Sequence, residues 1–83
     1  MSLQERFEDA AKRAKSLPNQ SNETLLDLYS LYKQGSSGDV SGSKPGPFDF
    51  VKKAKYEAWE KRQGMSQDEA MEAYIALVDK LGA

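Results

Sequence analysis

The amino-acid sequence predicts an all-α fold, a four-helix bundle with a long crossover loop between its second and third helices. Four segments of the 83-residue chain repeat their apolar residues at steps of three and four, the period of a helix that buries one side. No segment alternates apolar and polar residues as a half-buried strand does. A stretch rich in Gly, Ser and Pro separates the second segment from the third, and so long a connection allows successive helices to avoid lying antiparallel.

The composition limits which functions are possible. The chain has 12 Lys and Arg against 13 Asp and Glu, and it contains neither Cys nor His. Thiolate nucleophiles, imidazole bases and the usual zinc ligand sets are therefore missing, so we expect no catalytic residues, no metal site and no enzyme activity. We expect a single domain over residues 1–83 and a cytoplasmic monomer without stable membrane insertion, because no signal-like start or long uncharged stretch is present.

The first helix is expected between Leu3 and about Lys15 or Ser16. Pro18 cannot continue a helix and disfavours helical geometry in the residue before it, so the helix should end there and residues 18–20 should form a short connector. The apolar positions of this helix recur at steps of four and three: Leu3, Phe7, Ala10, Ala11, Ala14 and Leu17.

The second helix is expected to begin after a cap at Ser21 or Asn22 and to end near Gln34. Both residue types can accept hydrogen bonds from the free N–H groups of a helix start. The residues at helical spacing are Leu25, Leu28, Tyr29 and Tyr32. The next residues, 35–47, contain too much Gly, Ser and Pro for a regular element, and by composition alone they are a flexible linker or a functional loop.

The third helix is expected from Phe48 to Arg62, with Gly64 in a position to end it. Its apolar side consists of Phe50, Ala54, Ala58 and Trp59. The fourth helix should begin after Ser66, because Ser66-Gln67-Asp68-Glu69 has the pattern of a capping box, in which the serine and glutamate side chains each bind a free backbone N–H. Its buried side consists of Ala70, Tyr74, Leu77, Val78 and Leu81.

Aromatic and basic residues gather on the second and third helices. Tyr29, Tyr32 and Lys33 lie three or four positions apart, so they can surround one ligand. Further residues of the same kinds are Lys52, Lys53, Lys55, Tyr56 and Tyr74. A purine nucleotide requires such a set: a ring for the base, an ammonium group for a phosphate, and hydroxyl donors. The alternative is structural, with tyrosines packed in the core and lysines on a solvated face.

Several blocks of the sequence, in order, resemble the acyl-CoA-binding protein family. The blocks are Leu28-Tyr29-Ser30-Leu31-Tyr32-Lys33-Gln34, Gly38-Asp39, Lys44-Pro45-Gly46, Asp49-Phe50 and Lys53-Ala54-Lys55-Tyr56-Glu57-Ala58-Trp59. The segment from Ser66 to Ile75 is similar to the last helix of that family, and the segment from Phe7 to Leu17 fits its first helix. The resemblance therefore covers almost the whole chain.

The resemblance implies a four-helix protein that binds long-chain fatty acyl-CoA thioesters non-covalently, as an intracellular carrier and pool former without a cofactor. It implies that Tyr32 stacks on adenine, that Tyr74 forms a hydrogen bond near the ribose or phosphates, and that Lys15 occupies a basic position near the phosphates. The residues that the resemblance assigns to the 3′-phosphate are Tyr29, Lys33 and Lys55. The long connection would then be an ordered crossover rather than a linker.

Two residues of the third helix depart from the family pattern. Tyr56 stands where the family usually has Trp, and this change retains an aromatic ring. Val51 stands where many members have a basic residue, and Lys52 follows it one position later, about 100° further around the helix.

Two other functions are also weighed against the composition. A small helical protein-interaction module could use an aromatic-lined groove, and it would not respond to coenzyme A thioesters. Nucleic-acid binding through Lys52, Lys53, Lys55 and Tyr56 is disfavoured by the net charge of −1 and by the acidic start of the fourth helix. We therefore expect long-chain acyl-CoA as the partner and no nucleic acid.

Overall fold

The computed structural model describes residues 1–83 and consists of four helices without a strand. The helices are α1 (Leu3–Ala14), α2 (Asn22–Ser37), α3 (Phe50–Glu60) and α4 (Gln67–Leu81). The all-α, four-helix prediction is confirmed. None of the helices is long and apolar enough to cross a lipid bilayer.

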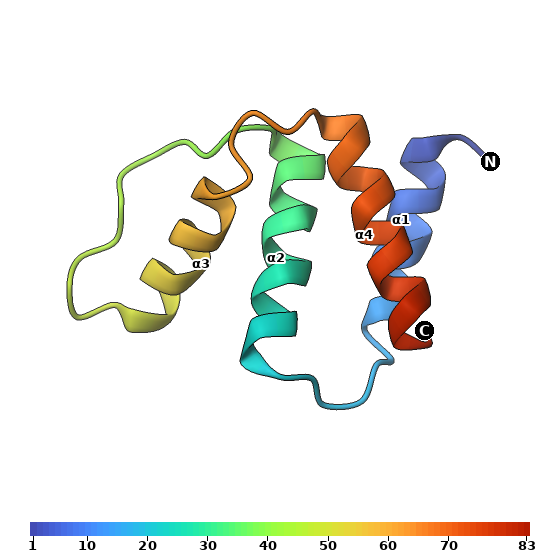
Figure 1. Cartoon of the computed structure of the whole chain (residues 1–83), viewed down its shortest axis with the longest axis horizontal. Coiled ribbons are helices and arrows are strands. Elements are labelled where there is room, and N and C mark those ends of the chain that lie inside the picture. Colours follow the sequence, from blue (N-terminus) through green and yellow to red (C-terminus); the bar gives the residue numbers. More distant parts are fainter.

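Helix α2 lies in the middle of the arrangement. It packs against α4 on one side and α3 on the other, and α1 packs against α4 (Figure 1). The colours of Figure 1 show that α2 and α3 run in the same direction, whereas α4 runs opposite to α2. The chain between α2 and α3, residues 38–49, therefore returns along the length of α2, as predicted for a crossover.

Serine side chains cap three of the four helices. Ser2, Ser21 and Ser66 each accept a hydrogen bond from a backbone N–H three residues later, at 3.1 Å. The predicted capping box is confirmed, because the Glu69 carboxylate also accepts from the backbone N–H of Ser66. Helix α3 is different, since the side chain of Asp49 makes no capping hydrogen bond.

The predicted end of α2 near Gln34 was wrong, because the helix continues to Ser37. The reason lies at Gly35, which is buried inside the helix. A Cβ atom at Gly35 would lie 3.1 Å from Cζ of Phe7 and 3.2 Å from Cγ of Met71. Gly35 therefore serves close packing of three helices, and the glycine that we interpreted as the start of a loop belongs to the helix.

Helix α3 is shorter than predicted, covering Phe50–Glu60 instead of Phe48–Arg62. After Glu60 the chain forms a tighter turn with i→i−3 hydrogen bonds, because the backbone N–H of Arg62 donates to the carbonyl of Trp59 at 2.9 Å. Gly64 ends this extra turn with φ +92°, a conformation that favours glycine. Helix α1 ends at Ala14, one residue before the predicted end near Lys15 or Ser16.

The hydrophobic core is formed by α1, α2 and α4. Its buried members are Phe7, Ala10, Leu31, Met71, Tyr74, Ile75 and Val78. Helix α3 adds one buried residue, Trp59, whose indole N–H donates to the carbonyl of Gly38 at 2.8 Å. Two residues placed on apolar helix sides by their spacing, Leu25 and Phe50, are instead exposed.

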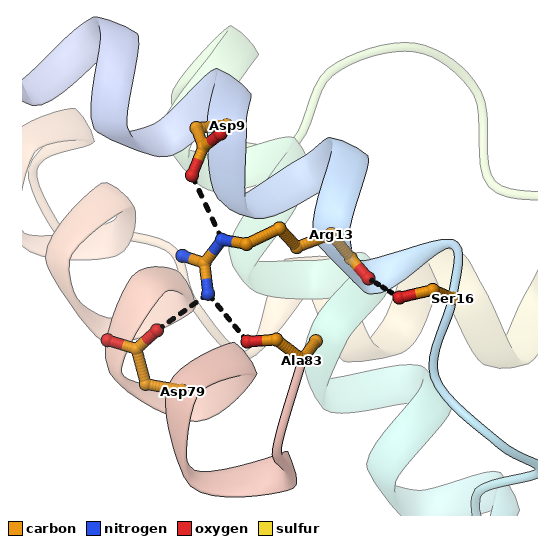
Figure 2. Close-up of polar contacts among 5 residues, drawn as sticks. All are labelled: Asp9, Arg13, Ser16, Asp79 and Ala83. Carbon is orange, nitrogen blue, oxygen red and sulfur yellow. Dashed lines mark hydrogen bonds and ion pairs between the residues drawn. The ribbon is translucent and has the colours of Figure 1, made fainter.

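Arg13 ties the end of α1 to the end of α4 (Figure 2). Its Nε atom donates to Asp9 at 2.9 Å, and its Nη1 atom donates to Asp79 at 2.9 Å and to the carbonyl oxygen of Ala83 at 2.7 Å. These carboxylates, Asp79 first and Asp9 second, raise the pKa of the Arg13 guanidinium. The contact therefore fixes the last turn of α1 to the last turn of α4.

Gln34 ties the other end of the molecule together. Its side chain is fully buried, and its amide nitrogen donates to Asp39 at 2.9 Å and to the carbonyl of Met65 at 2.8 Å. The same Asp39 oxygen accepts from the backbone N–H of Gly64 at 2.9 Å. The start of the crossover and the turn before α4 are thus fixed to α2.

Candidate ligand-binding site

Three cavities lie along α2. The first, of about 350 Å³, lies between α1, α2 and α4 and has mostly apolar walls with two lysines. Its lining residues are Ala11, Lys12, Ala14, Lys15, Leu28, Tyr29, Tyr32 and Tyr74. Three aromatic rings and two ammonium groups on an apolar wall can accommodate a flat ring that carries an anion.

The aromatic wall of this first cavity is fixed by Phe7. The Tyr32 ring stacks on Phe7, with 5.4 Å between ring centroids and 22° between planes. The Tyr74 ring meets Phe7 edge-on, at 5.2 Å and 71°. Tyr32 is 42% exposed although one face of its ring is covered, whereas Tyr74 is only 5% exposed. The ring of Tyr32 is therefore both rigid and available for stacking.

The Tyr74 hydroxyl is a free hydrogen-bond donor beside this cavity. Among the four tyrosines, only Tyr56 donates its hydroxyl within the protein, to the carbonyl of Gly42 at 3.2 Å. Burial, followed by the nearby Tyr32, raises the pKa of the Tyr74 phenol above its ordinary value. Tyr74 therefore stays protonated over a wider pH range and can donate to a ligand oxygen.

The second cavity, of about 290 Å³, lies between α2, α3 and the crossover. It is lined by Tyr29, Pro45, Lys52, Lys55, Tyr56 and Trp59. The Nζ atom of Lys55 lies 5.2 Å from the centre of the Tyr29 ring. The Nζ atom of Lys33 lies 4.9 Å from the centre of the Trp59 ring.

The lysines of this region are not neutralised by carboxylates. The ion pairs of the protein involve Arg13, Lys44 and Arg62, and none involves Lys33, Lys52 or Lys55. An aromatic face holds an ammonium group in place without cancelling its charge. Between α2 and α3 the protein therefore has a local positive site, although its net charge is −1, and such a site attracts an anion.

The third cavity is a groove of about 390 Å³ between the first halves of α2 and α3. Five of its lining residues are apolar, Leu25, Leu26, Phe50, Val51 and Ala54, and the other two are Asn22 and Lys55. Tyr29 lines both the first and the second cavity, and Lys55 lines both the second and the third. The three cavities are therefore neighbours, in the order tyrosines, lysines, apolar groove, and we call this row of cavities the path.

The structure brings most of the predicted site residues to this path. Lys15, Tyr29, Tyr32 and Tyr74 meet at the first cavity, and Lys55 joins Tyr29 at the second. The residue spacing placed Lys33 with Tyr29 and Tyr32 around one ligand. The Lys33 ammonium group instead lies over Trp59, toward α3. Tyr56, the departure from the family pattern, remains an aromatic wall of the second cavity.

Sequence reasoning missed several residues that line the path. Lys12 lines the first cavity with Lys15, which caps the end of α1, and their spacing of three could have indicated it. Lys52 was named among the basic residues but was not assigned to the ligand, and it lines the second cavity next to Val51 in the sequence. The role of Trp59 as a platform for Lys33 depends on how α3 packs against α2, which no local pattern indicates.

Known proteins share this sequence pattern and this fold. Residues 4–78 match the family model described as "Acyl CoA binding protein". The chain is 49% identical over 76 residues to acyl-CoA-binding protein homolog 1 of Caenorhabditis elegans, covering 90% of this chain and 88% of that protein. It is also 49% identical to the acyl-CoA-binding protein of Saccharomyces cerevisiae, covering 90% of this chain and 87% of that one.

Two solved structures of similar sequence have the same fold. The crystal structure of Oryza sativa Acyl-CoA-Binding Protein 2 is similar with a TM-score of 0.94 at 46% identity, covering 96% of this chain and 90% of that one. The solution structure of the yeast acyl coenzyme A binding protein is similar with a TM-score of 0.73 at 49% identity, covering 90% and 88%. The resemblance that the sequence blocks indicated is thereby confirmed: the chain belongs to the acyl-CoA-binding protein family.

Proposed function

We propose that this protein binds long-chain fatty acyl-CoA thioesters non-covalently and serves as a cytoplasmic carrier and reservoir for them. The observation that carries this proposal is the path of three cavities, which changes from aromatic to basic to apolar. An acyl-CoA changes in a matching way, from an adenine ring through phosphates to a hydrocarbon chain. Family membership supports the same function.

The nucleotide end of the ligand would bind at the first cavity. Adenine would stack on the free face of Tyr32, whose other face is held by Phe7. The Tyr74 hydroxyl, which has no partner in the protein, would donate to the ribose or to a phosphate. Lys15 and its neighbour Lys12 would supply positive charge for the phosphates from α1.

The 3′-phosphate would bind between α2 and α3. Lys33 from α2 and Lys55 from α3 would provide the ammonium groups, and the Tyr29 hydroxyl would add a donor. Each lysine already rests on an aromatic ring and has no carboxylate to release before it binds a phosphate. Charge-assisted hydrogen bonds of this kind contribute about 1.5–3 kcal/mol each. They would therefore favour a ligand that carries the 3′-phosphate of coenzyme A over one that lacks it.

The acyl chain would bind in the apolar groove. Removing about fourteen methylenes from water contributes on the order of 11 kcal/mol, at about 0.8 kcal/mol each, before the cost of immobilising chain and ligand is subtracted. The acyl chain would therefore set most of the affinity, and the nucleotide would set the identity of the ligand.

We also propose that the protein does not act chemically on its ligand and needs no cofactor. Hydrolysis or transfer of a thioester needs an activated nucleophile or base, and the sequence contains no Cys or His to supply one. Binding and release are the whole of the proposed activity.

Isothermal titration calorimetry with palmitoyl-CoA, free coenzyme A and palmitate tests the proposal. The thioester should bind much more tightly than either half, because neither half reaches both ends of the path. Comparable affinity for palmitate would indicate a general lipid carrier and would overturn the coenzyme A assignment. An absence of binding to all three ligands would favour the protein-interaction module.

A further inference from the structure

The residue that follows α2 has a backbone conformation that is almost exclusive to glycine. Gly38 has φ 81° and ψ −151°, a region that other residues avoid. A Cβ atom at this position would meet nothing within 4 Å, so glycine is needed here for the conformation of the backbone and not for space. Residues in this region cost free energy and persist only where the surrounding structure holds them.

The conformation of Gly38 turns its carbonyl group toward α3. Its N–H donates to the carbonyl of Gln34 at 3.0 Å, while its own carbonyl accepts from the indole N–H of Trp59 at 2.8 Å. Asp39 holds the next position, because one carboxylate oxygen accepts from both Gln34 and the backbone of Gly64. The acceptor for the indole N–H is therefore part of a fixed turn.

Trp59 in turn determines where the Lys33 ammonium group lies. The Trp59 side chain is buried, and the Nζ atom of Lys33 lies 4.9 Å from the centre of its ring. A lysine side chain is flexible, and helical spacing would equally allow the ammonium group to lie beside Tyr29. An indole ring that is held at its N–H offers one fixed face, and this face selects a single position for the ammonium group.

We propose that Gly38 and Trp59 are positioning residues, which hold the Lys33 ammonium group toward α3 and thereby set the selectivity of the site for ligands that carry a 3′-phosphate. Lys55 approaches from α3 and rests on Tyr29, so two ammonium groups would meet one phosphate from two helices. A lysine that is already held loses less conformational freedom when the phosphate binds. This inference rests on the proposed function, to whose ligand the 3′-phosphate belongs.

Calorimetry with palmitoyl-CoA and 3′-dephospho-palmitoyl-CoA tests the inference. The wild type should bind palmitoyl-CoA more tightly by about tenfold or more, the factor for one charge-assisted contact. Gly38→Ala should reduce this ratio by about twofold to tenfold, the usual cost of immobilising one side chain on binding. The reason is that alanine would no longer turn the carbonyl toward Trp59.

Gly42→Ala is the matched control. Gly42 lies in the same crossover, with φ 87° and no atom within 4 Å of its Cβ position, and its carbonyl accepts from Tyr56 and not from Trp59. Both glycine variants should lose stability, because alanine is strained at a positive φ. Only Gly38→Ala should change the ratio of the two affinities. An equal change in both variants would indicate a general effect on the crossover and would overturn the inference.

Trp59→Phe keeps an aromatic ring and removes the donor to Gly38. It should reduce the ratio as Gly38→Ala does. In a protein that already carries Lys33→Ala, Trp59→Phe should have no further effect on the ratio, because the group that Trp59 positions is gone. Equal effects of Trp59→Phe with and without Lys33 would show that Trp59 supports only the fold, and the inference would be wrong.

The position of Lys33 can also be measured without a ligand. In proton magnetic resonance spectra, the ring current of the indole should shift the ε-methylene protons of Lys33 upfield of those of Lys80, which lies on no aromatic ring. Gly38→Ala should return them toward the ordinary lysine value, whereas Gly42→Ala should not. An ordinary value in the wild type would overturn the inference.

The two proposals fail in different ways. A protein that shows the shifted Lys33 protons but binds neither thioester would overturn the proposed function, and the selectivity with it. A protein that binds palmitoyl-CoA tightly, with the same ratio in the wild type, Gly38→Ala and Trp59→Phe, would keep the proposed function and overturn this inference alone.

Discussion

The two sides of α2 are built differently. Toward α1 and α4, α2 meets a continuous core in which the rings of Phe7, Tyr32 and Tyr74 contact each other. Toward α3, Trp59 is the one residue of α3 that is buried, and the rest of the interface consists of lysines, aromatic rings and two cavities. The core side accounts for stability, and the α3 side keeps open the space that a ligand needs.

This contrast predicts that mutations on the two sides have different effects. A change on the core side should lower the free energy of unfolding, because it removes or crowds packed atoms. A change at a lysine on the α3 side should lower affinity and leave the fold intact. Residues that contact both the core and a cavity should show both effects, and a conservative substitution should separate them.

Tyr74 gives the largest expected effect, because its ring is packed in the core. Its hydroxyl also borders the first cavity, so it should affect both stability and affinity. Tyr74→Ala should lower the free energy of unfolding by about 3–5 kcal/mol through the cavity it leaves. Tyr74→Phe should fold normally and bind acyl-CoA more weakly by about 0.5–1.5 kcal/mol, the contribution of one hydrogen bond. Chemical denaturation and calorimetry measure the two quantities. Unchanged affinity in Tyr74→Phe would assign Tyr74 to the core alone.

Lys33 and Lys55 test the α3 side. Replacing either residue by Ala should weaken acyl-CoA binding by about 1.5–3 kcal/mol and reduce its dependence on salt, because one ammonium–phosphate contact is lost. The melting temperature should fall by only a few degrees, since a cation–π contact near the surface contributes about 0.5–1 kcal/mol. Lys80→Ala is the matched control and should alter neither quantity. A large loss of stability without a loss of affinity would show that these lysines are structural.

Gly35 tests the core side of the same helix. Gly35→Ala should lower the free energy of unfolding by up to about 2 kcal/mol, because crowding of Phe7 and Met71 by the new methyl group costs about 1–3 kcal/mol and the better helix propensity of Ala returns about 1 kcal/mol. Gly46→Ala in the crossover is the control, since no atom lies within 4 Å of its Cβ position. Urea denaturation of the two variants compares them directly. Equal stability in both would mean that α2 can shift away from its neighbours at no cost.

Asp39 gives the smallest expected effect, and that effect depends on pH. The Gly64 N–H, followed by the Gln34 side chain, lowers the pKa of Asp39 below its ordinary value of about 4. A carboxylate with a lowered pKa stabilises the folded state above its unfolded pKa, and this contribution is lost as the pH falls through the folded value. The difference in melting temperature between wild type and Asp39→Asn should therefore shrink in acid. A constant difference would show that charge is not involved.

Local patterns predicted the helices well because caps and breakers act over a few residues. Pro18 and Ser66 mark helix boundaries whatever surrounds them. Gly35 was misinterpreted because a glycine needed for close packing looks, in sequence, the same as one needed for a flexible loop. Only the positions of Phe7 and Met71, which come from other helices, distinguish the two.

The candidate site was predictable in part. Periodicity placed Leu25 and Phe50 on apolar sides, but it cannot distinguish the wall of an open groove from a filled core. Helical spacing grouped Lys33 with Tyr29, but the partner that holds the Lys33 ammonium group, Trp59, lies on another helix. From the residues alone a structural interpretation remained possible, and the whole-chain resemblance indicated the coenzyme A ligand.

The one-sided attachment of α3 has a consequence for hydrogen exchange. Because α3 packs chiefly on α2 and follows a crossover, it can open as a unit while α1, α2 and α4 stay folded. Its amide protons should then exchange faster than those of α4. A ligand held by Lys33 on one side and Lys55 on the other would slow that exchange, so part of its binding energy would go into closing α3. The most easily opened part of the molecule would thus also be the part that the ligand protects most.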